Sequence, residues 1–294
     1  MNVVNTIEAG NMSVVRTGVL SRLILDLKHK LAQIADSNVF VSYFIYRLLT
    51  RATFLLPHDR SYYAFRYFFD SRPEGLFLDL GANNGISALS FRRLNKSYDI
   101  FSIEPNMAHQ KSLQRIAGKD NKFQFRMEGV GEKSESLVFF IPYYYGLTLH
   151  TAVSCDRSFL MDQIKSIGVS VDKVRIREHL VAITPVDSLG LFPALIKIDC
   201  EGHELPILKG AKKTIINSQP VILMEYSQDI LGGDYTLNFK AFLDECQYGD
   251  YYFEPDSGMV GRCKEGHYEN KTGGRNILLI PDSRVNEIPE KFRK

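Results

Sequence analysis

The stretch Leu76–Ser87, LFLDLGANNGIS, has the pattern of a buried strand that runs into a glycine turn and then opens a helix. Apolar residues lead up to Asp79 near the carboxyl end of the strand, and Gly81 and Gly85 allow the backbone to turn tightly and approach a ligand. Phosphate-binding turns avoid negative charge, because they use backbone N–H groups and a helix N-terminus. A carboxylate at this point instead suits a ligand that carries an amine or a sulfonium.

A second informative stretch begins more than one hundred residues later. Ala194–Glu204, ALIKIDCEGHE, is another apolar strand, and it ends in a dense cluster of ionisable groups before a helix expected over 204–217. Four charged side chains at a strand end cost too much to bury without partners. The cluster is therefore expected to line a crevice.

The turn DLGANNG resembles motif I of S-adenosylmethionine-dependent methyltransferases. The stretch KIDCEGHE at 197–204, followed by LKGA and then PVILME, resembles the FkbM family of methyltransferases, over roughly residues 75–228. The resemblance implies an α/β fold of the Rossmann-like class I type, with a doubly wound, mostly parallel seven-stranded sheet. It also implies S-adenosyl-L-methionine as the cofactor, with Gly81, Asn83 and Gly85 in its binding turn.

Length and composition fit one large α/β domain with an appendage. The 294 residues divide into an N-terminal helical segment (1–70), a methyltransferase domain (71–285) with an insertion over about 132–190, and a tail (286–294). The net charge of +2 is too small to indicate a nucleic-acid-binding protein. The four scattered cysteines show no Cys-x-x-Cys spacing, which indicates free thiols in a reducing cytoplasm. The first eighteen residues are polar, so no secretory signal is expected.

The segment 18–56 alternates basic and apolar positions. A basic amphipathic helix of this kind can lie on an anionic membrane surface, which makes the protein peripheral to the membrane. It can equally pack its apolar stripe on the core or on a second subunit, forming a homodimer. The aromatic run Tyr62–Phe69 is expected to be a core-facing helix.

From residue 75 onward, strand and helix patterns alternate, which favours a parallel sheet. The expected strands of that sheet are 76–80, 99–104, 123–128, 194–199, 220–225, 251–253 and 276–280, the last two as an antiparallel pair. Helices are expected at 85–95, 106–117 and 204–217. The insertion contributes a strand over 135–141, a helix near 157–167 and a short extended piece at 180–184.

Glu104 ends the second strand, 25 residues after Asp79. In open α/β sheets, an acid about twenty residues beyond the glycine turn bonds the hydroxyls of a ribose, and a carboxylate suits a vicinal diol because it only accepts. Alternatively, Glu104 caps the helix that follows this strand. By resemblance, the end of the third strand approaches the adenine ring, where Glu128 accepts from the exocyclic amine or else is a solvent-exposed acid.

Methyl transfer to a hydroxyl requires positioning of the acceptor and removal of its proton. Asp199 and Glu225 end adjacent strands, where doubly wound folds place ligands, and His203 titrates near neutrality. By resemblance, Asp199 lies nearest the methionine side and positions both cofactor and acceptor. His203 is either the base or a surface residue of a first helical turn. Asp199, His203 and Glu225 could also bind a divalent metal, although their spacing matches no closed structural site.

The acceptor is expected to contact the insertion. The segment 141–151, IPYYYGLTLHT, is aromatic and contains a glycine, and aromatic faces with hydroxyl tips suit sugars or polyketide-like rings. His150 in this segment is a second candidate base. The resemblance implies O-methylation of a hydroxyl on a glycan or a secondary metabolite. The alternatives are a nicotinamide-dependent oxidoreductase, which the turn GANNG disfavours, and a non-catalytic methyltransferase-like binding protein.

Overall fold

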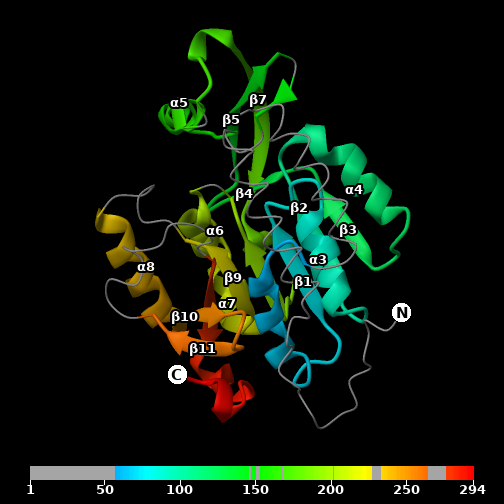
Figure 1. Cartoon of the computed structure of the whole chain (residues 1–294), viewed down its shortest axis with the longest axis vertical. Helices are drawn as coiled ribbons and strands as arrows, with labels where there is room; N and C mark the ends of the chain where they lie inside the picture. The colour runs from blue at the N-terminus through cyan, green and yellow to red at the C-terminus, as the bar shows by residue number, and fades with distance from the viewer. Residues whose placement is uncertain are drawn as a thin grey trace.

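The computed structural model describes residues 57–145, 147–149, 153–166, 168–200, 202–226, 233–263 and 276–294. The predicted amphipathic segment 18–56, Glu201 and His150 lie outside these residues. Two sheets make up the described part, a large central sheet and a smaller one that projects from its upper end (Figure 1).

The central sheet has eight strands in the order β11-β10-β12-β9-β8-β1-β2-β3. The five strands from β9 to β3 are parallel, and β12, β10 and β11 are antiparallel to their neighbours. The strands are β1 (Leu76–Leu80), β2 (Asp99–Ile103), β3 (Phe123–Arg126), β8 (Leu195–Ile198), β9 (Val221–Glu225), β10 (Tyr248–Glu254), β11 (Met259–Arg262) and β12 (Asn276–Pro281).

The expectation of a mostly parallel α/β sheet is confirmed, whereas the number of seven strands is wrong. The eighth strand is β11, which pairs with β10 at the sheet edge. It is four residues long, and Gly261 lies so close to the Tyr252 ring that a Cβ on the glycine would come within 2.3 Å of it. A short strand interrupted by glycine shows little of the alternation that marks a strand in a sequence.

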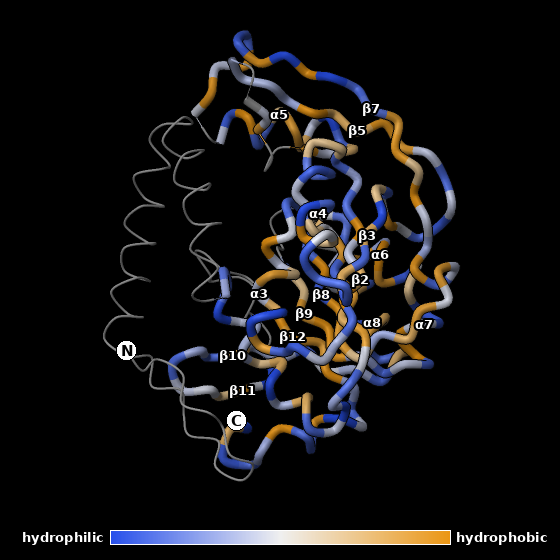
Figure 2. The backbone as a smooth tube through the Cα atoms, turned by 90° about the vertical axis from the view of Figure 1, so that its right-hand side faces the viewer, coloured by the Kyte–Doolittle hydropathy of each residue, from blue (hydrophilic) through white to orange (hydrophobic). Residues whose placement is uncertain are grey.

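Helices cover both faces of the central sheet, so the sheet is doubly wound. One apolar core joins alternate strand residues, such as Leu78 and Ile196, to the helices α6 (Glu204–Gly210), α7 (Lys212–Ser218) and α8 (Gly233–Cys246). The other joins Phe77 and Leu195 to α3 (Ile86–Leu94), α4 (Gln110–Ala117) and the 3₁₀ helix η1 (Arg60–Phe68). Figure 2 shows the apolar central strands between these two layers.

The predicted core-facing helix at the aromatic run is confirmed as η1. Tyr62, Phe65 and Phe68 are each no more than 1% exposed, and Phe65 packs edge-on against Phe77 and Phe91. The helix predicted over 204–217 is divided into α6 and α7 at Ala211. At the break, Gly210 packs so closely against the Gly131 carbonyl that no side chain would fit. Helix α8 was not predicted.

The insertion forms the second sheet, with strand order β4-β7-β5-β6. Its elements are β4 (Gly129–Val130), β5 (Glu135–Tyr144), β6 (Leu147–Thr148), α5 (Arg157–Ser166) and β7 (Val174–Thr184). Strand β7 is far longer than the piece predicted at 180–184, since its residues 174–183 all pair with β5. Short 3₁₀ turns complete the structure: η2 (Met107–His109), η4 (Val171–Lys173), η5 (Val186–Leu189), η6 (Asp282–Glu287) and η7 (Glu290–Phe292).

Candidate active site

The glycine turn after β1 lies at the carboxyl ends of the parallel strands. Gly81 and Gly85 have φ angles of 78° and 87°, which L side chains rarely adopt. A Cβ on Gly81 would lie 2.0 Å from the backbone oxygen of Asp199, and one on Gly85 would lie 2.3 Å from Ile116. Both glycines are therefore required by conformation and by space, and Gly81 brings the turn against the end of β8.

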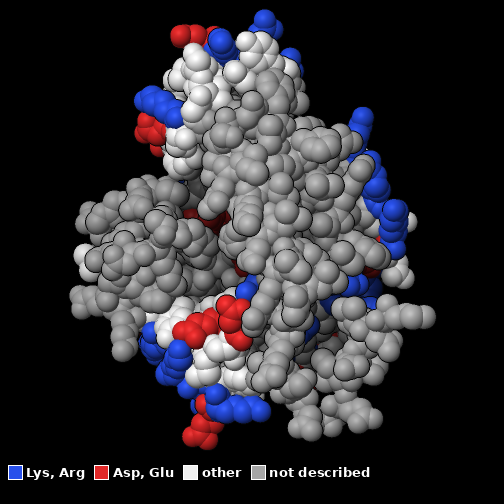
Figure 3. All heavy atoms as spheres, viewed as in Figure 1, with Lys and Arg blue, Asp and Glu red and all other residues white. Residues whose placement is uncertain are grey.

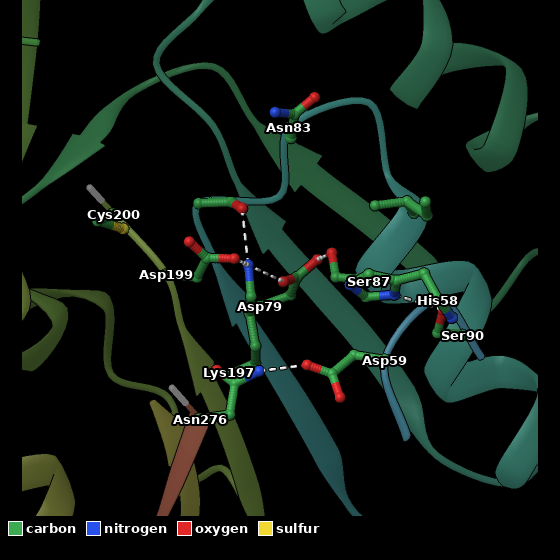
Figure 4. A network of polar contacts seen from close by, with 12 residues as sticks. His58, Asp59, Asp79, Asn83, Ser87, Ser90, Lys197, Asp199, Cys200 and Asn276 are labelled. Carbon is green, nitrogen blue, oxygen red and sulfur yellow. Dashed lines mark hydrogen bonds and ion pairs between the residues drawn. The ribbon is translucent and has the colours of Figure 1, made fainter. Parts of the chain in front are cut away.

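A buried ion pair lies beneath this turn (Figure 4). Asp79 and Lys197 are register partners on β1 and β8, and Lys197 Nζ lies 3.8 Å from Asp79 Oδ1. Lys197 also donates to the Gly81 carbonyl at 2.9 Å and pairs with Asp199 at 3.3 Å. The other oxygen of Asp79 accepts from Ser87 and Ser102 at 2.6 and 2.9 Å. This network fixes the turn relative to the strand ends.

Asp79 is 0% exposed, so it acts on the turn mainly through Lys197. Burial raises the pKa of Asp79, and Lys197 with the two serines offsets this only in part. Burial would lower the pKa of Lys197, but the carboxylates of Asp199 and Asp79 raise it above its usual value. Lys197 therefore stays charged. Asp79 Oδ1 has no hydrogen-bond partner among the described residues.

Asp199 and Glu225 form a carboxyl pair at the ends of β8 and β9. The Asp199 side chain is 39% exposed, so it is open to a ligand. Burial would raise the pKa of Asp199, but Lys197 and a hydrogen bond with Glu225 hold it below its usual value. A hydrogen bond between two carboxyl groups needs a proton on one of them, so the two groups act as a pair. The structure thus brings together two of the three predicted catalytic residues.

His58 extends this site from a part of the chain that the sequence did not single out. Its Nδ1 lies 2.7 Å from Ser90 Oγ, and its charge lowers the pKa of Asp199. The next residue, Asp59, bonds Asn276 of β12 and caps η1 by accepting from Ser61 N at 2.7 Å. The segment before η1 therefore joins the wall of the site (Figure 4).

Glu104 holds the opposite side of the turn. One carboxylate oxygen accepts from Asn83 N at 2.7 Å and the other from Asn106 N at 2.8 Å. Asn83 itself has a positive φ of 50°. Burial raises the pKa of Glu104 to about 7, despite these two backbone hydrogen bonds. Each oxygen has a second acceptor position for a diol, and Glu104 also shapes the turn.

A pocket of about 110 Å³ opens next to Glu104, between the two sheets. Pro105 and Met107 line it from the end of β2, and Met127 lines it from the end of β3. Phe139 and Ile141 of β5 and His179 and Val181 of β7 form the opposite wall. The apolar lining with a few polar atoms suits a flat heterocycle.

Two other acidic residues near the site have structural contacts. Glu128 accepts from Thr184 at 3.0 Å and lies 3.5 Å from Arg126, so it links the end of β3 to the end of β7. Glu204 accepts from the backbone N–H of Cys200 and of Gly202, which fixes the loop after β8.

His203 lies apart from the carboxyl pair. Its Nε2 is 3.4 Å from where a Cβ on Gly131 would be, and burial lowers its pKa while Glu135 acts to raise it. Within the described residues, no group of three His, Cys, Asp or Glu side chains is arranged to hold a metal ion. The geometry therefore does not assemble Asp199, His203 and Glu225 into one cluster. Burial also raises the pKa of the Cys200 thiol, which makes it a weak nucleophile.

Lys197, like His58, is a site residue that the sequence analysis did not identify. It stands in the quoted KIDCEGHE stretch, and a lysine inside an otherwise apolar strand is a signal for a buried partner. Ser87 and Ser102 gave no comparable signal, because their partner Asp79 lies 8 and 23 positions away.

A comparison with protein families matches residues 79–258 to the methyltransferase FkbM domain. The match spans more than half of the chain, and the protein belongs to the FkbM methyltransferase family. The resemblance inferred from the glycine turn and the KIDCEGHE stretch is thereby confirmed. A search of curated proteins found no match.

Solved structures show only distant similarity. The FkbM methyltransferase from Methylobacillus flagellatus KT has 18% identity and a TM-score of 0.45, and the match covers 74% of this chain and 47% of that one. The chain thus matches about half the length of that protein. Precorrin-6y C5,15-methyltransferase from Geobacter metallireducens GS-15 has 10% identity, a TM-score of 0.35 and coverage of 70% and 78%. An rRNA methylase from Streptococcus thermophilus has 11% identity, a TM-score of 0.36 and coverage of 75% and 94%.

Proposed function

We propose that this protein transfers a methyl group from S-adenosyl-L-methionine to a hydroxyl oxygen of a glycan or a secondary metabolite. The observation that carries the proposal is the position of two acids on either side of the glycine turn. Glu104 bonds the turn through Asn83 N at 2.7 Å, and the backbone oxygen of Asp199 lies against Gly81.

The donor groups fit the proposed cofactor. Asp199 presents negative charge to an ammonium or sulfonium beside the turn, and Gly81, Asn83 and Gly85 form the turn itself. Glu104 has acceptor positions for the ribose hydroxyls, and the Met107 and Met127 wall of the pocket suits the adenine ring, which leaves the β5 and β7 wall to the acceptor. Asp79 supports the methionine side from below through Lys197. When bound, the cofactor supplies the electrophilic methyl group.

The proton of the acceptor hydroxyl is taken by the Asp199–Glu225 pair. Asp199 is ionised and partly exposed, so its carboxylate can accept a hydrogen bond from the hydroxyl and orient the oxygen. Glu225 fixes the orientation of the Asp199 carboxylate through the hydrogen bond that joins the two groups. His203 lies at the start of helix α6, and no step of the proposed reaction depends on it.

The family match favours methyl transfer over the nicotinamide alternative, although both cofactors present a ribose diol to Glu104. Isothermal titration of the full chain with S-adenosylhomocysteine and, separately, with NAD⁺ tests the cofactor. Binding of the former alone is expected, and Glu104→Gln should weaken it about tenfold or more, since a charged hydrogen-bond acceptor is lost. Binding of NAD⁺ alone would overturn the proposal.

Turnover is tested by release of S-adenosylhomocysteine in the presence of hydroxylated acceptors, with Asp199→Asn as the matched inactive variant. A wild-type protein that binds the cofactor without releasing the product on any acceptor would support the non-catalytic alternative. Within the described residues no helix is both long and apolar enough to cross a membrane. Contact with a membrane surface or a second subunit through 18–56 is part of this proposal and is tested by liposome flotation and sedimentation.

A further inference from the structure

Strand β7 presents basic side chains at alternate positions along one face. Arg175, Arg177 and His179 are all exposed, and because alternate residues of a strand point to the same side, the three share a face. We refer to these three residues as the basic face of β7. Val174 and Ile176, on the other face of the strand, instead pack against the apolar cluster of α5, which confirms the opposite orientation.

The basic face continues the wall of the pocket beside Glu104. Phe139 pairs with His179 and Ile141 with Arg177 in the β5–β7 register, and Phe139, Ile141 and His179 all line the pocket. From His179, Arg177 and then Arg175 follow outward along the same side of the strand. The pocket therefore opens onto a row of positive charges at the upper end of the molecule, where Figure 3 shows basic side chains among some acidic ones.

An aromatic ring accompanies these charges. Tyr143 of β5 is the register partner of Arg175, and the Arg177 guanidinium lies 5.1 Å from the centre of its ring. This contact holds the arginine flat while its N–H groups remain available. An aromatic face beside a guanidinium suits a sugar ring that bears an oxyanion.

Within the described part of the chain, the two arginines of the basic face have no acidic partner. Among the described residues, no acidic side chain forms an ion pair with Arg175 or Arg177. Neighbouring positions on one strand face lie about 7 Å apart, so like charges there repel one another. An anion between them would relieve the repulsion.

We infer that the basic face of β7 binds an anionic group of the acceptor, a phosphate or a carboxylate on a sugar, while the acceptor hydroxyl lies at the cofactor end of the site. The inference rests on the proposed methyl transfer and adds to it the chemical class of the acceptor. Arginine forks bond both kinds of oxyanion in a bidentate manner, and the outward row allows an acceptor longer than a single ring.

The probes are glucose 6-phosphate, glucuronate and glucose, titrated into the full chain by saturation-transfer NMR. At least one anionic sugar should bind, and glucose should bind at least tenfold more weakly. Comparison of the two anionic probes decides between phosphate and carboxylate. The Arg175→Gln/Arg177→Gln double variant should weaken the bound probe about tenfold or more, since it removes two charge-assisted donors. Lys209→Gln/Lys213→Gln removes two exposed charges on α6 and α7 and should bind like wild type.

Three results would overturn the inference: wild type binds none of the anionic probes, glucose binds equally well, or the double variant binds like wild type. The inference would also be overturned if a single-stranded RNA oligonucleotide bound more tightly than the anionic sugars and this binding were lost in the double variant. That result would assign the basic face to nucleic acid. Titration with S-adenosylhomocysteine separates this inference from the proposed function. The double variant should retain wild-type affinity for that ligand, and failure of wild type to bind it would count against the proposed function alone.

Discussion

Replacing Lys197 by methionine tests the buried network beneath the glycine turn. The Lys197→Met variant loses the 2.9 Å hydrogen bond to the Gly81 carbonyl and leaves Asp79, which is 0% exposed, without its cation. Removing one partner of a buried ion pair costs about 3–5 kcal/mol, because an uncompensated charge stays buried. That is a large share of the roughly 5–15 kcal/mol by which a domain is stable.

The assay is urea unfolding at pH 7.5, followed by titration of the folded variant with S-adenosylhomocysteine. Lys212→Met is the matched control, since Lys212 pairs with Glu245 on the surface, and it should unfold like wild type. The double variant Lys197→Met/Asp79→Asn should recover part of the loss, because the orphaned charge is also removed. The affinity of Lys197→Met for S-adenosylhomocysteine should fall about tenfold or more, since the turn loses its anchor.

Two outcomes would refute this reasoning. One is a Lys197→Met variant whose free energy of unfolding lies within about 1 kcal/mol of wild type, the range of a surface pair. The other is a double variant at least as unstable as the sum of the two single variants. Either result would mean that Asp79 and Lys197 are not coupled in the folded protein.

Other perturbations probe the turn and the carboxyl pair. Because the pKa of Glu104 is raised to about 7, its carboxyl becomes protonated as the pH falls from 8 to 6. The affinity for S-adenosylhomocysteine should therefore drop about tenfold over this range. In the Glu104→Gln variant, calorimetric titration should show no such dependence of affinity on pH. Gly81→Ala should abolish that affinity, because its Cβ would lie 2.0 Å from a backbone oxygen. Gly168→Ala is the control, since Gly168 has a similar φ but nothing within 4 Å of a Cβ. A thermal melt of this control should show only the cost of the backbone conformation, about 1 kcal/mol. Glu225→Leu removes the hydrogen bond to Asp199 and should lower turnover about 10²–10⁴-fold with little change in cofactor affinity, whereas His203→Ala should lower it less than tenfold. The reverse order in initial-rate measurements would make His203 the base.

The sequence by itself determined the framework of the site. Apolar runs followed by an acid or a glycine turn located the ends of β1, β2, β8 and β9, and carboxyl ends of parallel strands meet at one edge of a sheet. The proximity of the glycine turn to Glu104 and Asp199 follows from that rule alone. The family also followed from two local stretches, because their residues lie close together in the chain.

The tertiary structure alone decided which side chains meet. Asp79 pairs with Lys197 across 118 positions, since β1 and β8 are register neighbours in the sheet and the insertion between them forms a separate sheet. His58 reaches Ser90 for a similar reason, and His203, although four residues from Asp199, lies beside Gly131. The orientation of a side chain at the start of a helix depends on the packing around it, and a local pattern holds no information about that packing.

The basic face of β7 lies between these two cases. The alternation of apolar and basic residues over Val174–Arg177 is visible in the sequence, and it favours a strand with one polar face. Which cavity that face meets depended on the pairing of β7 with β5 and on the position of both beside Pro105 and Met127. The periodicity is a property of the chain, whereas the neighbours of the face follow from contacts between segments far apart in it.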